Sequence, residues 1–147
     1  MAVSFHNEDI TYKLTRKILH KNWIAACIGK LGKKAGAISF IFTSNPRILQ
    51  LNREYLQHNY FTDVITFDYS DENLLSGDIF ISIDQVKINA LEYGVGVSAE
   101  LRRVMVHGVL HLAGFKDSTE KEKDIMHELE NDALTLWLKW DKNDAGI

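Results

Sequence analysis

The segment HGVLHLAGFKD, residues 107–117, contains the side chains of this chain that are best suited to bind a metal ion. His107 and His111 are four residues apart in an apolar run that predicts a helix, so both imidazoles project from one face, one turn apart. Gly114 permits a sharp turn after this helix, and Asp117 can then swing back towards the histidines. The segment therefore predicts a His₂Asp site for Zn²⁺, with a fourth position open to water as in catalytic zinc sites.

The same residues also admit a purely structural interpretation. The two histidines could be hydrogen-bonded residues of an ordinary helix, and Asp117 could cap the last helix, because DSTE also fits a capping box. His127 and Glu128 are alternative third ligands further along the chain. The residue after the first histidine is Gly108, where zinc peptidases of the HExxH type carry a glutamate as general base, so the sequence argues against that peptidase chemistry.

The composition is that of a globular protein that is long enough to bury one hydrophobic core. The chain has 147 residues, of which 46% are hydrophobic and 25% are charged. No apolar run approaches the ~18 residues of a membrane span, and the N-terminus shows no secretory signal pattern. The single cysteine, Cys27, cannot form a disulfide within the chain. We therefore expect one domain, residues 1–147, in the cytoplasm and without a membrane segment.

The net charge of −3 conceals a strong asymmetry along the chain. Residues 1–50 carry eight basic and two acidic side chains, a net +6, whereas residues 51–147 carry nine basic and eighteen acidic ones, a net −9. A locally basic region can bind a phosphate backbone even when the whole chain is acidic. We expect Lys30, Lys33 and Lys34, in the glycine-rich turn GKLGKK, to contribute to substrate binding, although such a run is also compatible with a solvated surface.

Hydrophobic periodicity and turn residues predict an α+β fold, with a small mixed four-stranded sheet covered by about five helices. The metal site would lie on a helix and the loop that follows it. The expected strands are residues 3–6, 37–43, 63–69 and 78–83, and the expected helices are residues 9–28, 45–56, 84–93, 98–114 and 119–140.

Connections and helix starts can also be predicted. We expect residues 37–69 to form a right-handed parallel strand–helix–strand unit, and DENLLSG to close a hairpin between the last two strands. Asn45, Asp84 and Ser98 are the expected N-caps of three helices. Thr119 and Glu122 stand at the two positions of a capping box at the start of the last helix.

Three segments of the chain, VHGVLHLAGFKD, LNREYL with TDVITFDY, and GDIFIS, together resemble the YbeY family of bacterial rRNA maturation factors. VHGVLHLAGFKD resembles the family signature H-G-x-L-H-L-x-G-[YF]-D-H, except that Lys116 and Asp117 stand where the family has its aspartate and its third histidine. Upstream, LNREYL followed by TDVITFDY resembles the family's L-N-x-x-Y-R and T-[DN]-V-L-S-F segments, and GDIFIS resembles G-D-I-x-I. The matches come in family order and at family spacing, and they span about residues 50–117.

The resemblance implies a zinc-dependent endoribonuclease that acts in small-subunit rRNA maturation and ribosome quality control, with rRNA or its precursors and the small ribosomal subunit as partners. The family's three ligands, which are also the implied catalytic centre, fall on His107, His111 and Asp117, with one Zn²⁺ per chain. A water molecule or the RNA 2′-OH would be the nucleophile activated there. Two alternatives remain open: a metal-dependent hydrolase of another substrate, and a largely non-catalytic zinc-containing assembly factor.

The sequence departs from the family pattern near the expected substrate site. The arginine that follows the family tyrosine is Leu56 here, which removes a cation able to stabilise a phosphorane-like transition state. His58 and Lys116 are candidate replacements and candidate substrate-binding residues; Lys116 stands where the family has an aspartate. Asp63 and Thr66 could orient the ligands or the substrate, or could simply be polar residues of a strand.

Overall fold

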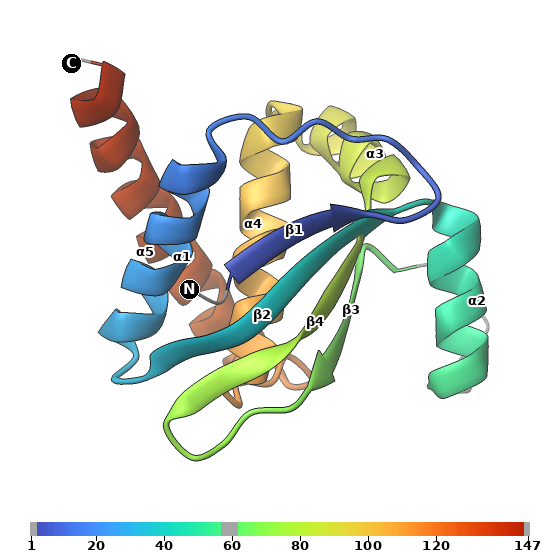
Figure 1. Cartoon of the computed structure of the whole chain (residues 1–147), viewed down its shortest axis with the longest axis horizontal. Helices are drawn as coiled ribbons and strands as arrows, with labels where there is room; N and C mark the ends of the chain where they lie inside the picture. The colour runs from blue at the N-terminus through green and yellow to red at the C-terminus, as the bar shows by residue number, and fades with distance from the viewer. Residues whose placement is uncertain (1–2, 57–61, 146–147) are drawn as a thin grey trace.

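Within the part of the chain that the structure describes, the fold is a four-stranded sheet with five helices (Figure 1). The structure is a computed structural model that describes residues 3–56 and 62–145. The strands are β1 (Val3–Asn7), β2 (Lys34–Thr43), β3 (Val64–Asp68) and β4 (Leu74–Ser82). The helices are α1 (Lys17–Lys30), α2 (Asn45–Tyr55), α3 (Ile83–Tyr93), α4 (Val97–Leu112) and α5 (Glu120–Ala145). The predicted α+β class is therefore confirmed. None of the helices within the described ranges has the length and apolar character of a membrane span.

The sheet is mixed, with the strand order β1-β2-β4-β3. β2 pairs in parallel with β1 and with β4, and β3 pairs with β4 in antiparallel orientation. The predicted hairpin is confirmed, but the prediction of a parallel unit over residues 37–69 is wrong. A short connection joins β3 and β4 in an antiparallel hairpin. Because β4 lies beside β2 and runs parallel to it, β3 is the outer strand and runs antiparallel to β2.

Hydrophobic residues form cores on both faces of the sheet. Along β4, Ile79 and Ile81 point into the larger core beneath α1, α4 and α5, while Phe80 points to the opposite face, as the two-residue repeat of a strand requires. On that face α2 covers a smaller core, in which Ile48 packs with Ile65 of β3. The antiparallel outer strand is thus buried from both sides at the point where it approaches α4.

Helix α4 is the most enclosed helix of the fold. Nine of its sixteen residues are buried, and it contacts α3, α5, β3 and β4. It approaches the sheet closely at Gly108, where an added Cβ would lie 2.7 Å from Ile79 Cγ2 and 3.4 Å from Thr66 Cγ2. The missing side chain therefore lets α4 cross directly over β3 and β4 and fixes where its neighbour His107 lies.

The N-caps of α2, α3 and α4 differ from the sequence prediction. Ser44 and Ser82 cap α2 and α3, accepting from the backbone N–H groups of residues 47 and 85, and Gly96 precedes α4 without a side-chain cap. Asn45, Asp84 and Ser98 are therefore not the caps. Asn45 N–H donates to the Asp84 carboxylate at 2.9 Å and Ser82 Oγ donates to Asn45 Oδ1 at 2.6 Å, so these side chains join the starts of α2 and α3.

The first helix is shorter than predicted at its N-terminus, since α1 begins at Lys17 rather than at residue 9. Asp9 accepts hydrogen bonds from Thr43 and Ser44 at the end of β2, and Arg16 adopts the left-handed backbone conformation at φ 56°. Tertiary hydrogen bonding thus holds this segment out of the helix. The predicted capping box of the last helix is confirmed, with Thr119 N to Glu122 Oε1 at 2.9 Å and Glu122 N to Thr119 Oγ1 at 3.1 Å.

The close contact at Gly108 can be tested by adding one methyl group. Gly108→Ala should lower the free energy of unfolding by about 1–3 kcal/mol, because the clash with Ile79 outweighs the gain of ~1 kcal/mol in helix propensity. The measurement is chemical denaturation followed by circular dichroism. Gly29→Ala, in α1, is the control, because no atom lies within 4 Å of its added Cβ, and it should be neutral or slightly stabilising. Equal effects of the two variants would contradict this account of the contact.

Candidate metal site

One row of polar side chains on α4 faces a cleft. Glu100, Arg103, His107 and His111 follow one another at helical spacing, and all four line this cleft, whose volume is about 1140 Å³. The other walls come from β3, the ends of α2 and α3, and α5. A helix that is largely buried in the core thus presents a polar stripe to this space.

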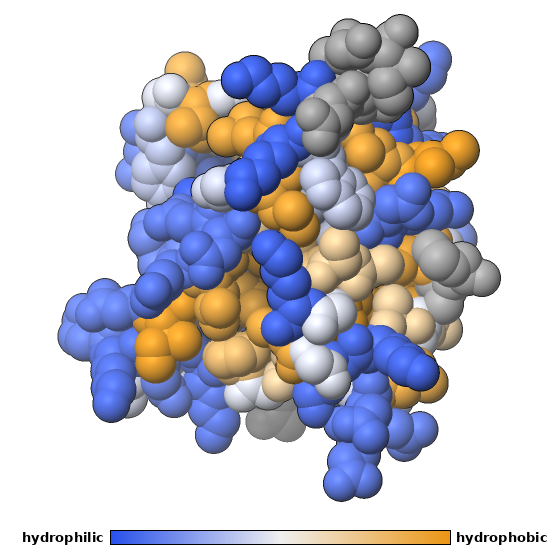
Figure 2. Space-filling view, turned by 90° about the vertical axis from the view of Figure 1, so that its left-hand side faces the viewer, coloured by the Kyte–Doolittle hydropathy of each residue, from blue (hydrophilic) through white to orange (hydrophobic). Residues whose placement is uncertain are grey.

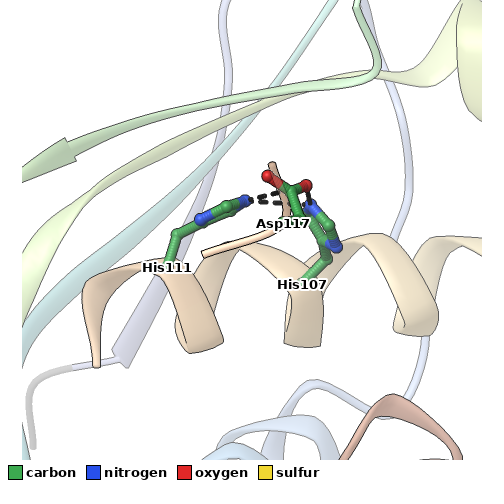
Figure 3. A group of neighbouring side chains, drawn as sticks. All are labelled: His107, His111 and Asp117. Atoms are coloured by element: carbon green, nitrogen blue, oxygen red, sulfur yellow. Dashed lines mark hydrogen bonds and ion pairs between the residues drawn. The ribbon is translucent and has the colours of Figure 1, made fainter. Parts of the chain in front are cut away.

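His107, His111 and Asp117 converge on one point in the cleft (Figure 3). The two Nε2 atoms lie 3.0 Å apart, and Asp117 Oδ2 lies 3.2 Å from His107 Nε2 and 3.5 Å from His111 Nε2. Zinc bonds of about 2.0–2.1 Å at tetrahedral angles would separate such atoms by about 3.3 Å. The spacing of the three ligand atoms therefore fits one small tetrahedral metal ion.

The turn after α4 brings Asp117 back to the helix, as the sequence predicts. Gly114 has φ 96°, a left-handed conformation that glycine adopts without strain. Gly114 N–H donates to His111 O and Phe115 N–H donates to Leu110 O, so the chain reverses tightly. Asp117 consequently faces the histidines rather than acting only as a helix cap.

A second set of acceptors orients both histidine rings. Glu130 of α5 accepts from His107 Nδ1 at 2.6 Å, and the carbonyl oxygen of Phe115 accepts from His111 Nδ1 at 3.1 Å. Glu130 is itself buried and accepts from Arg103 Nη1 at 2.8 Å. Hydrogen bonds at Nδ1 leave the lone pair of each neutral ring on Nε2, the atom that faces Asp117. Nothing in the spacing of the ligands pointed to Glu130, because its place depends on how α5 packs.

This arrangement of acceptors suits a cation. Two imidazole lone pairs and a carboxylate oxygen that converge within 3.5 Å repel one another unless a proton or a metal ion lies between them. Two nitrogen donors and one oxygen donor also form a set that Zn²⁺ accepts, with one position left for water. The residues present therefore fit a catalytic zinc ion.

The two histidines differ in basicity because their surroundings differ. Burial by itself lowers the pKa of His107, but the hydrogen bond and charge of Glu130, together with the charge of Asp117, outweigh it and raise the pKa above 6.5. For His111, burial and the charge of His107 lower the pKa below 6.5, against the opposing effect of Asp117. The ring bound to Glu130 is thus the one that holds a proton more readily when no metal is present.

Two further carboxylates lie in the cleft beside the triad. Glu100 lies in the first turns of α4, and Asp63 precedes β3. Burial raises the pKa of both side chains. The sequence marked Asp63 as a polar residue of the matched segment but gave no sign of Glu100, which only the packing of α4 against α3 places in the cleft.

The predicted substrate-binding lysines lie away from the metal triad. Lys30 ends α1, Lys34 begins β2, and Lys33 Nζ, between them, donates to the carbonyl oxygen of Glu72 at 2.7 Å. None of these three side chains lines the cleft. Figure 2 looks onto the side where α1 and α5 lie and shows hydrophilic side chains spread around apolar ones.

The other residues that the sequence singled out differ in where they lie relative to the cleft. Leu56 lines it, directly after α2, and Lys116 is exposed next to Asp117. His58 lies outside the described residues. His127 of α5 has 69% of its side chain exposed and lies 3.8 Å from Glu130, so it borders the cleft without joining the triad. Glu128 is exposed on α5, and the cleft is formed without it.

Comparison with known proteins identifies the family of the chain and agrees with its fold. Residues 3–137 match the family model described as endoribonuclease YbeY. The chain belongs to the YbeY family. It is 46% identical over 136 residues to endoribonuclease YbeY of Parabacteroides distasonis and 44% identical over 136 residues to that of Bacteroides thetaiotaomicron. These alignments cover 92% of this chain in both cases, and 96% and 99% of the relatives.

A solved structure has the same fold. The solution structure of TM1509 from Thermotoga maritima superposes with a TM-score of 0.65 at 26% sequence identity, over 99% of this chain and 95% of that one. The correspondence with this family covers the chain from β1 to α5, including the helix and turn that carry the triad.

The different basicity of the two histidines gives a prediction for the metal-free protein. In an NMR titration of the imidazole C–H signals, His107 should titrate above pH 6.5 and His111 below it. Glu130→Gln should lower the pKa of His107, because it removes the charge that stabilises the imidazolium.

The raised pKa of His107 determines how the stability of the metal-free protein depends on pH. Protonated His107 stabilises the fold below about pH 6.5, and this contribution is lost as the pH rises through its higher folded-state pKa. Glu130→Gln should therefore destabilise the metal-free protein more at pH 5.5 than at pH 8.5. Glu128→Gln, an exposed neighbour on α5, is the control and should leave the titration of His107 unchanged. An unchanged titration in Glu130→Gln would contradict the role of this hydrogen bond.

Proposed function

We propose that this chain is a zinc-dependent endoribonuclease whose metal ligands are His107, His111 and Asp117. The observation that carries the proposal is the convergence of these three ligand atoms in an open cleft. The relatives at 44–46% identity are named endoribonucleases, and the same substrate class is proposed for this chain. The wide cleft, rather than a closed cage, suits a polymeric substrate.

The residues of the chain would divide the work as follows. A bound zinc ion supplies Lewis acidity, which polarises a phosphoryl oxygen and acidifies water or a 2′-OH. Glu130 and the carbonyl oxygen of Phe115 hold the two rings in the tautomer that binds metal. Arg103 keeps the buried charge of Glu130 compensated. Asp117 adds a negative charge that a third histidine would not, and this charge would make water on a bound metal ion less acidic than at a three-histidine site.

Charge stabilisation of the scissile phosphate needs a cation that Leu56 does not provide. Among the described residues that line the cleft, Arg103 and Lys123 are the lysine and arginine side chains. Arg103 already donates to Glu130 and Asn131, at 2.8 and 3.0 Å. We therefore assign the phosphate-facing role to Lys123 of α5, with Lys116 and His58 as the further candidates that the sequence suggests.

The proposed biological role is small-subunit rRNA maturation and ribosome quality control in the cytoplasm, carried out by a single domain over residues 1–147. The family match over residues 3–137 and the basic N-terminal third support this role. The replacement of the family arginine by Leu56 favours one alternative, a zinc-containing assembly factor without nuclease activity. RNA cleavage assays with and without a chelator separate the two, because only the nuclease loses a measurable activity on metal removal.

Metal content tests the triad directly. Elemental analysis of the purified protein should show about one zinc per chain. His111→Ala should lose most of it, and Glu130→Gln should weaken zinc binding by about 10–100-fold, because His107 loses its orienting partner. Asp117→His should keep the metal.

The control for metal content is His127→Ala, at the rim of the cleft, which should retain full zinc. Full zinc content in a His107/His111 double alanine variant would overturn the proposed site. Zinc lost from Asp117→His but kept in Asp117→Ala would remove Asp117 from the ligand set.

Substitutions in the basic turn test whether it forms the proposed RNA-binding surface. A cleft lined by Asp63, Glu100 and Glu130 repels phosphates, so most backbone contacts must come from elsewhere. Changing Lys30, Lys33 and Lys34 to Gln should weaken binding to single-stranded RNA and flatten its dependence on log salt by about 0.7 for each phosphate that is no longer neutralised. Zinc content should not change. The measurement is fluorescence anisotropy at several salt concentrations.

The control is a second triple lysine-to-glutamine variant, made at exposed positions of α5: Lys121, Lys139 and Lys142. It changes the net charge by the same amount. A salt slope that changes equally in both variants would show a general charge effect and place the RNA surface elsewhere.

A further inference from the structure

Glu100 is a buried carboxylate that faces the cleft without a hydrogen-bond partner among the described residues. It is 4% exposed, it lines the cleft from the first turns of α4, and no hydrogen bond or ion pair joins its side chain to another residue in the described ranges. Its carboxylate oxygens are not among the fully enclosed side-chain atoms that lack a partner in the described part of the chain, so they reach the open cleft. A ligand in the cleft can therefore donate hydrogen bonds to them, and a largely buried carboxylate favours such donors.

Two hydrogen-bond donors that line the same cleft as Glu100 are bonded to other acceptors. Arg103, three residues along the same face of α4, donates to Glu130 and Asn131. Asn89 Nδ2, across the cleft on α3, donates to Asp63 Oδ2 at 3.3 Å. Burial raises the pKa of Glu100, the charge of Arg103 opposes this, and the charges of Asp63 and Glu130 add to it. Arg103 and Asn89 are thus bonded to other acceptors rather than to Glu100.

The surroundings of Glu100 limit what the ligand can be. Asp63 and Glu130 add negative charge, so a phosphate group is disfavoured at this end of the cleft. Among the described residues, His107, His111 and Asp117 are the only three metal-binding side chains with ligand atoms within 4.8 Å of one another, so the acids around Glu100 do not form a second metal site. A hydrogen-bond donor that carries no negative charge suits this position, and an RNA offers such donors in the N–H groups of its bases.

The position of Glu100 relative to the triad matches a base flanking the scissile bond. Seven residues separate Glu100 from His107 on α4, which is about 10 Å along the helix axis. A nucleotide whose phosphate lies at the triad can extend its base along α4 over such a distance. At the same end, Tyr93 closes α3 with 62% of its surface exposed and lines the cleft, where its ring is available to stack on a base.

We propose that the Glu100 carboxylate binds the Watson–Crick edge of a guanine next to the scissile phosphate, and so makes the cleft selective for guanine. This inference rests on the proposed endoribonuclease function. Guanine is the RNA base with two adjacent N–H donors, N1–H and the N2 amino group, which match the two oxygens of one carboxylate. Adenine and cytosine place an acceptor beside their amino group, and uracil places a carbonyl on each side of its N–H, so each sets an acceptor against a carboxylate oxygen.

The test compares two nucleotides that differ only in one donor group. Guanosine 5′-monophosphate and inosine 5′-monophosphate have the same phosphate and ribose, but inosine lacks the N2 amino group. Titration calorimetry on the full chain should show the guanosine nucleotide bound about 10-fold more tightly, because one charge-assisted hydrogen bond is lost with inosine. Equal affinities, or no binding of either nucleotide at millimolar concentration, would overturn the proposal.

Variants then assign the preference to Glu100. Glu100→Gln keeps the shape of the side chain but sets an amide donor against one guanine donor, so the ratio of the two affinities should fall to about one. Glu92→Gln, an exposed glutamate on α3, is the matched control and should keep the 10-fold ratio. Thermal melts of both variants establish that they fold. A ratio in Glu100→Gln equal to that of the unmodified chain would overturn the assignment.

The nucleotide test is independent of the cleavage test. If the preference for guanosine is present while RNA is never cleaved, the nuclease proposal fails and the base site stands. If RNA is cleaved in a metal-dependent manner with equal rates next to guanosine and inosine, the base site fails and the nuclease proposal stands.

Discussion

The close contact of α4 with the sheet at Gly108 is the constraint on which the rest of the structure depends. Because this residue has no side chain, α4 lies directly against Ile79 of β4 and Thr66 of β3. The buried residues of α4 pack into the core, and the polar residues of the remaining stripe face the cleft. A bulkier residue at this position would move the whole row from Glu100 to His111, so packing and chemistry cannot be separated in this helix.

The triad is supported from a second direction by α5. Glu130 is buried and ion-paired with Arg103, and it holds His107 through a hydrogen bond of 2.6 Å. Breaking such a buried pair on one side would leave an uncompensated charge, which is strongly destabilising. The network therefore couples the orientation of the metal ligand to the docking of the last helix. His111 is held instead by the backbone of the turn after α4, so the two rings depend on different parts of the fold.

Charge is divided between the cleft and the surface in a way that suits a nucleic acid substrate. The cleft gathers carboxylates around the triad, which would attract a metal ion and offer hydrogen-bond acceptors to the bases of an RNA. Backbone phosphates are repelled by the same groups and need the basic side chains that the N-terminal third supplies. Such a division would let the bulk of the affinity come from the phosphates and the selectivity from one buried side chain.

The sequence by itself determined the α+β class, the His107–His111 pair, the turn at Gly114 and the return of Asp117, because all of these depend on local spacing and backbone preference. It also determined the family, through three motifs in order. The order of the strands, the caps at Ser44 and Ser82, and the positions of Glu130 and Glu100 in the cleft were decided by tertiary structure alone. Each depends on contacts between residues far apart in the chain: β4 inserts beside β2, α5 brings Glu130 to His107, and Glu100 lines a cleft whose other walls include β3 and α5. Local patterns carry no information about which distant partner a buried polar group will meet.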